Sequence, residues 1–100
     1  MSAATLLEAS IVADRRSHPD FPLNFDAFLQ THSFVIEPVT EAQARIARLA
    51  YRQYGRGSEH KAKLNFGDCF AYALARERNE PLLFTGDDFI HTDIRPALAP

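Results

Sequence analysis

The sequence predicts a small α/β domain built on a short parallel sheet. Its 100 residues support a single domain. The composition, 46% hydrophobic and 24% charged, is ordinary for a globular protein and argues against disorder or a coiled coil. Helix-like and strand-like segments alternate along the chain, and such alternation favours helices packed on parallel strands.

Two helices are expected in the first third of the chain. Residues 2–17 are rich in the helix formers Ala, Leu and Glu, with Ser2 as a cap and a stop at Ser-His-Pro. After a loop over 19–22, Asn24 is expected to cap a short second helix, because apolar residues follow at spacings of three and four. These residues are Phe25, Phe28 and Leu29.

A strand and a third helix are expected next. Residues 33–37, Ser-Phe-Val-Ile-Glu, form a short apolar run typical of a strand, which Pro38 ends. Thr40 is expected to open a helix that Gly55 and Gly57 close. The apolar face expected for this helix comprises Ala44, Ala47, Leu49, Ala50 and Tyr54.

The last third predicts one more helix and one more strand. After a polar, basic loop, Asn65 is expected to cap a helix over 66–78. Residues 82–84, Leu-Leu-Phe, are typical of a short strand that leads into a turn and an irregular tail. Two visible strands are few for a parallel sheet, whose strands are normally buried among several neighbours. We therefore expect either a partner that completes the sheet or an incomplete domain.

Glu8 lies in unusual surroundings for an acidic side chain. It falls within the apolar stretch Leu-Leu-Glu-Ala-Ser-Ile-Val. A carboxylate surrounded by apolar residues is costly unless it is paired, protonated or bound to a metal ion. The structural alternative is that Glu8 lies at the edge of the apolar stripe, or pairs with Arg15 or Arg16.

Three further acidic residues stand at positions where function and structure are both plausible. Asp68 begins a helix whose next seven residues carry no charge, which places it at the mouth of the core. Its structural alternative is a capping role opposite Asn65. Asp87 and Asp88 directly follow the second strand, where ligands of α/β sheets gather, although turns have the same composition. Brought together, these carboxylates would attract a hard divalent cation.

A basic stripe is expected on the third helix. The net charge of −2 gives no general reason to expect nucleic-acid binding, so any such surface must be local. The alternative is a solvated face in which Glu41 pairs with Arg45. The stripe also permits a less favoured function for the whole chain, that of a small helical nucleic-acid-binding module. The stripe comprises Arg45, Arg48, Arg52 and Arg56, continued by His60, Lys61 and Lys63.

The remaining composition restricts the location and chemistry. The single cysteine, Cys69, excludes an internal disulfide framework and suits a reducing cytoplasm. We expect it to be a buried small hydrophobic side chain. No apolar run approaches ~18 residues, so no membrane span is expected. The apolar start, interrupted by Glu8, is not typical of a signal peptide.

Three segments carry a specific family resemblance. They read Asn-Phe-Gly-Asp-Cys-Phe-Ala-Tyr-Ala-Leu-Ala over 65–75, Pro-Leu-Leu-Phe-Thr-Gly-Asp-Asp-Phe over 81–89, and Thr-Asp-Ile over 92–94. Segments 2–9 and 50–57 support them. With these motifs the chain resembles the PIN-domain ribonucleases, and within them the VapC toxins of bacterial toxin–antitoxin pairs, over essentially its whole length.

The resemblance implies a fold, a reaction and partners. It implies a PIN-like three-layer α/β fold, with 1–100 as a single, partial domain. It implies a magnesium-dependent endoribonuclease, with Mn²⁺ as the alternative ion, and an RNA substrate, a cognate antitoxin, a homodimer and no membrane. The matching catalytic acids are Glu8, Asp68 and Asp88, which also hold the metal together with Asp87. The RNA-binding surface would comprise Arg45, Arg48, Arg52, Arg56, Lys61 and Lys63.

One departure from the family pattern shapes the expectation of activity. The family's first strand, whose Asp is its first metal ligand, and the helices after it have no match in this sequence. We therefore expect a fold that lacks them and a weakened metal site. The alternative function is a catalytically inactive PIN remnant that acts by antitoxin binding or dimerisation. The apolar first two helices suit that role, and ordinary core packing explains them equally well.

Overall fold

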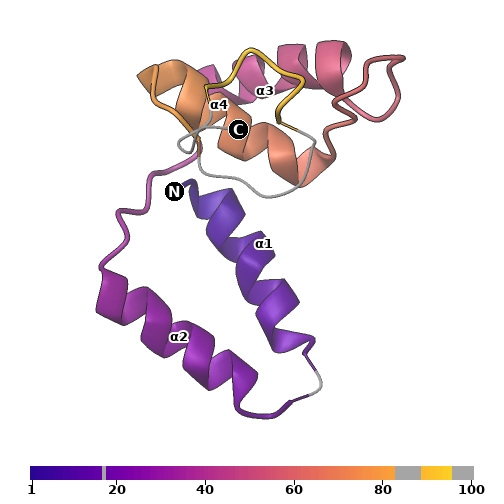
Figure 1. Ribbon diagram of the computed structural model, residues 1–100. Coiled ribbons are helices and arrows are strands. Elements are labelled where there is room, and N and C mark those ends of the chain that lie inside the picture. The colour runs from indigo at the N-terminus through magenta and orange to yellow at the C-terminus, as the bar shows by residue number, and fades with distance from the viewer. Residues whose placement is uncertain (17, 83–88, 96–100) are drawn as a thin grey trace.

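Four helices make up most of the computed structural model, which describes residues 1–16, 18–82 and 89–95 (Figure 1). Helices α3 and α4 pack against each other along their length. Helix α1 contacts α4 at one end and runs beside α2, and α2 contacts no other helix. The elements are α1 (Ala3–Asp14), α2 (Phe21–His32), α3 (Glu41–Tyr54) and α4 (Phe66–Arg78).

Three helices begin at the predicted caps. The side chains of Ser2, Thr40 and Asn65 each accept a hydrogen bond from a backbone N–H of the first turn. Such bonds satisfy N–H groups that have no partner within the helix. Helix α4 also ends at Arg78 as predicted, followed by Asn79 in a left-handed conformation with φ 52°.

The first two helices differ from their predicted limits. Helix α1 ends at Asp14 rather than at residue 17, before the turn that brings α2 back beside it. The predicted loop over 19–22 is correct for residues 19–20 only, and the predicted cap at Asn24 is wrong, because Asp20 is the N-cap of α2. Pro22 lies in the first turn, where a missing N–H removes no intrahelical bond.

The first predicted strand is reduced to an isolated parallel bridge. Ser2 pairs with Glu37, whose N–H donates to the Met1 carbonyl at 2.8 Å and whose carbonyl accepts from Ala3 N–H at 2.8 Å. The rest of 33–37 forms no strand, so that prediction fails before Glu37. Parallel strands are stable among several neighbours, and this segment pairs here with one short stretch. The prediction for 82–84 lies mostly outside the described residues.

A small core lies between α3 and α4. Tyr54, Leu64 and Tyr72 are buried there, and a second parallel bridge joins Gly55 to Leu64. The predicted apolar face of α3 is only partly correct, since Leu49 is 62% exposed. The core-facing side of α3 instead runs through Gln43, which is buried, Ile46, Ala47, Ala50 and Tyr54.

Candidate metal and RNA site

A cavity of about 530 Å³ lies between the start of α1 and the first turns of α4. Two of the predicted acidic residues, Glu8 and Asp68, line it together although they are 60 residues apart in sequence. Much of the remaining wall is apolar. It includes Phe34, Ala71, Leu74, Ala75, Pro81, Leu82 and Phe89.

Glu8 projects from the second turn of α1 toward α4. Its carboxylate lies so close to Gly67 that a Cβ at that position would overlap both carboxylate oxygens. The alternative pairing with Arg15 or Arg16 does not form in the part of the chain that the structure describes. The guanidinium of Arg16 instead lies 5.5 Å from the ring centroid of Phe21. Glu8 is therefore directed at the start of α4 and not at its own helix end.

Asp68 has the capping role predicted for it. Its Oδ2 accepts a hydrogen bond from Asn65 N–H at 3.0 Å, and Asn65 Oδ1 accepts from Asp68 N–H at 2.8 Å. This reciprocal capping box holds the carboxylate at the positive end of the α4 dipole. Because Asp68 also lines the cavity, capping fixes its orientation beside Glu8.

Asp87 and Asp88 lie outside the described residues. Phe89, which follows Asp88 in the sequence, is buried and lines the same cavity as Glu8 and Asp68. Over residues 1–16, 18–82 and 89–95, no three His, Cys, Asp or Glu side chains are grouped closely enough to hold a metal ion.

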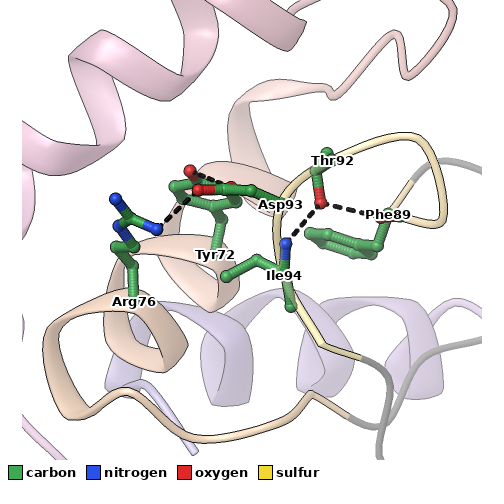
Figure 2. Close-up of polar contacts among 6 residues, drawn as sticks. All are labelled: Tyr72, Arg76, Phe89, Thr92, Asp93 and Ile94. Carbon is green, nitrogen blue, oxygen red and sulfur yellow. Dashed lines mark hydrogen bonds and ion pairs between the residues drawn. The ribbon is translucent and has the colours of Figure 1, made fainter.

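A polar network fixes the segment that begins at Phe89 (Figure 2). Asp93 accepts a hydrogen bond from Tyr72 Oη at 2.6 Å and pairs with Arg76 at 2.5 Å. Thr92 Oγ1 donates to the Phe89 carbonyl at 2.7 Å and accepts from Ile94 N–H at 3.2 Å. Burial, together with the hydrogen bond and charge of Asp93, raises the pKa of Tyr72. The segment after Asp88 is thus tied to α4.

Sequence reasoning did not assign this role to Asp93. The Thr-Asp-Ile motif over 92–94 marked the segment, but its partners Tyr72 and Arg76 are 21 and 17 residues away. The signal that could have identified them is their spacing, since residues four apart share one face of α4.

The predicted RNA-binding residues are all exposed. Arg45 pairs with Glu41 at 3.1 Å, as the solvated-face alternative expects. Arg48 and Arg52 line a separate cavity between α3 and α4. Arg56, Lys61 and Lys63 belong to the segment between these helices.

Cys69 is buried in the core, as predicted. Burial, assisted by the nearby charge of Asp68, raises the pKa of its thiol to about 11. Its Sγ donates to the Asn65 carbonyl at 3.4 Å. A protonated, buried thiol is a poor nucleophile, which fits a packing role.

In residues 1–16, 18–82 and 89–95 no helix has the length and apolar character that crossing a bilayer requires.

Comparison with known proteins identifies the family. The model of the PIN domain family matches residues 1–94, and the chain belongs to this family. It is similar to "VapC ribonuclease Mb0625" of Mycobacterium bovis, with 53% identity over 98 residues, 98% of this chain and 74% of that protein. The resemblance inferred from the motifs is therefore confirmed.

Two further relatives, both from Mycobacterium tuberculosis, extend this similarity. "Ribonuclease VapC42" is 50% identical over 97 residues, 97% of this chain and 74% of the relative. "Ribonuclease VapC30" is 43% identical over 100 residues, 100% of this chain and 76% of the relative. The family implies an α/β PIN fold, of which the described residues show the helices and two parallel bridges.

The donor chemistry of the cavity fits the divalent metal that PIN-domain ribonucleases generally need. Mg²⁺ and Mn²⁺ prefer carboxylate oxygens as ligands. Glu8 and Asp68 bring such oxygens to one cavity from two different helices. They account for part of the ligand set expected from the motifs, and Asp87 and Asp88 lie outside the described residues.

Proposed function

We propose that this chain is a VapC-type toxin of a toxin–antitoxin pair and cleaves RNA endonucleolytically with a divalent metal ion. The observation that carries the proposal is the convergence of Glu8 and Asp68 on one cavity. The names of relatives up to 53% identical support the same reaction class. Mg²⁺ is the proposed ion and Mn²⁺ the alternative. We also place the protein in the cytoplasm, where its single free thiol would stay reduced.

In the proposed mechanism Glu8, Asp68 and Asp88 would hold the metal and orient the attacking water, with Asp87 as a further ligand. A bound Mg²⁺ would supply a more acidic water and stabilise charge on the phosphodiester. Asp68 is oriented for this role by the Asn65 N–H. Gly67 gives Glu8 the room to approach α4, because any side chain there would displace its carboxylate.

RNA is proposed to approach along the basic residues of α3 and the segment after it. Phosphate neutralisation by Lys and Arg supplies sequence-independent affinity. Arg45 is the weakest candidate, because its ion pair with Glu41 competes with phosphate for the guanidinium. The remaining residues are Arg48, Arg52, Arg56, Lys61 and Lys63.

An antitoxin and a second copy of the chain are the proposed protein partners. Helix α2 has no buried residue and α1 has one, Ala13. Core packing within the described residues therefore does not explain their apolar side chains, which an interface would cover. The exposed apolar residues include Leu7, Ile11, Val12 and Leu23. The alternative function, an inactive PIN remnant that acts through binding alone, would use the same surface.

Cleavage of RNA by the purified chain tests the proposal. Wild-type protein should cleave in Mg²⁺ and stop when EDTA is added, and Asp68→Asn should abolish cleavage. Asparagine can still accept the Asn65 N–H, so the helix cap and the far-UV circular dichroism spectrum should be retained. Glu80→Gln is the matched control, because Glu80 lines the same cavity but matches no catalytic position.

Two outcomes separate the functions. Full activity of Asp68→Asn would remove the metal assignment. Absence of cleavage by the wild type, under conditions in which the M. bovis relative is active, would reject the enzyme. Co-purification of that inactive chain with an antitoxin would then support the binding-only alternative.

A further inference from the structure

A second cavity, of about 340 Å³, lies between α3 and α4 on the side away from Glu8. Aromatic side chains form part of its wall: Tyr51 from α3, and Phe66 and Phe70 from α4. The rings of Phe66 and Phe70 meet edge to face with centroids 5.0 Å apart. Phe66 is nevertheless 78% exposed. A large aromatic side chain so exposed at the mouth of a cavity offers its ring to a ligand.

Positive charge accompanies these rings. Arg48 and Arg52, one turn apart on α3, also line this cavity. Three other arginines have carboxylate partners, in the pairs Arg45–Glu41, Arg76–Asp93 and Arg78–Glu37. Arg48 and Arg52 have none within the described ranges, and no lining residue is acidic. The site therefore favours a ligand that is planar, apolar on its faces and negatively charged beside them.

We propose that this cavity binds one unpaired nucleobase of single-stranded RNA, stacked on Phe66, with Arg48 and Arg52 on the flanking phosphates. Base–aromatic stacking next to guanidinium groups is a common way to hold single strands without reading sequence. The inference deepens the proposed function, because it adds a substrate-positioning site to the ribonuclease proposed above.

The position of the cavity relative to the candidate metal site suits this role. Phe66, Cys69 and Phe70 line the base cavity, whereas Gly67, Asp68 and Ala71 line the acidic one. At 100° per residue these sets occupy opposite faces of the same two turns of α4. A helix with its side chains is about 10–12 Å across. A base held on one face would thus position a nearby phosphodiester of the same strand at the other.

Binding of a short unstructured oligoribonucleotide that contains 2-aminopurine tests the inference. With EDTA present no metal-dependent cleavage occurs, so binding is measured apart from catalysis. We expect stacking to quench the 2-aminopurine fluorescence, and Phe66→Ala to abolish the quenching and weaken affinity about ten-fold. Phe66→Tyr should restore both, because its ring can still stack. Phe28→Ala, which removes an exposed ring from α2, is the matched control and should change neither.

Salt dependence tests the charges. Arg52→Gln should reduce the slope of log affinity against log salt by about 0.7, the value for one phosphate contact on a single strand. Arg15→Gln, which removes an exposed charge at the end of α1, should leave the slope unchanged.

Three results would overturn the inference: no RNA binding by the wild type, quenching and affinity unaffected by Phe66→Ala, or a dimer that Phe66→Ala dissociates without any change in RNA affinity. The last result would assign this face to a second copy of the chain. RNA bound but never cleaved would reject the proposed ribonuclease and leave the base site standing.

Discussion

The carboxylate of Glu8 lies against Gly67. A Cβ at residue 67 would overlap one of its oxygens, so no side chain fits there. This contact joins α1 to the first turn of α4 beside Asp68, the neighbour of Gly67 in sequence. A glycine inside a helix normally lowers stability, by about 1 kcal/mol relative to alanine. Here the missing side chain is what lets two candidate metal ligands share one cavity.

Gly67→Ala is expected to separate metal binding from stability. The added Cβ should displace Glu8 and lower Mn²⁺ affinity, measured by titration calorimetry, by about 10–100-fold. The thermal unfolding midpoint should fall little, since alanine favours the helix. Gly57→Ala is the control, because a Cβ there meets no atom within 4 Å. Equal Mn²⁺ affinity in both variants and the wild type would exclude Glu8 as a ligand.

Removal of the α4 cap should lower the stability of the protein measurably. Asn65→Ala deletes the acceptor for Asp68 N–H and is expected to lower the free energy of unfolding by about 1 kcal/mol. Asn24→Ala lies inside α2, where alanine is the better helix former, and should cost nothing. Urea denaturation of the two variants measures the difference. Equal stabilities would show that the capping box contributes little.

Tyr72→Phe removes one of the two side-chain contacts of Asp93 that hold the segment after Asp88. A hydrogen bond to a charged group contributes about 1.5–3 kcal/mol. We expect a loss near the lower end, because Asp93 is partly exposed and keeps its pair with Arg76. Urea denaturation at neutral pH measures the loss. A variant as stable as the wild type would show that Arg76 alone fixes this segment.

Stability should decline in alkali, and Tyr72 should account for part of the decline. Its pKa is raised above the ordinary tyrosine value of 10.0, chiefly by burial and then by Asp93, so the folded state favours the protonated phenol. That contribution is complete below about pH 10 and is lost as the pH rises from there toward the folded pKa. Tyr72→Phe should lose less stability than the wild type between about pH 10 and about pH 12. Identical declines would contradict this. The raised pKa of Tyr54 leaves a residual slope in both proteins.

The thiol of Cys69 should resist alkylation in the folded protein. Its pKa of about 11, raised from 9.0 mainly by burial, leaves almost no thiolate at neutral pH. Iodoacetamide labelling followed by mass spectrometry should be slow at neutral pH and become rapid in urea. Labelling at the same rate in both conditions would show that the thiol is accessible in the native state.

The sequence predicted what is decided locally. Caps such as Thr40 and Asn65 act within one turn, and both helices that follow them begin where expected. The strand over 33–37 failed because pairing depends on neighbours distant in sequence, and only Glu37 finds one here. Leu49 was misplaced because the buried side of α3 is defined by where α4 packs, which its own periodicity did not reveal.

In the candidate site, too, the sequence indicated individual residues, and tertiary packing decided how they are arranged. Residue chemistry marked Glu8 and Asp68 as unusual, but only the family resemblance suggested that they act together, and the structure brings both to one cavity. The basic stripe was predicted as one surface from helical spacing. In the structure Arg48 and Arg52 line the aromatic cavity, and Arg45 is paired with Glu41.

The sparse packing of helix α2 has consequences for local unfolding of the protein. It contacts α1 and no other helix, and none of its residues is buried. Amide protons in α2 should therefore exchange with solvent by local opening, at a free energy well below that of global unfolding. Those in the middle of α3 and α4, which share the core, should exchange last. We therefore expect α3 and α4 to unfold as one cooperative unit, and α2 to fold and unfold independently of that unit.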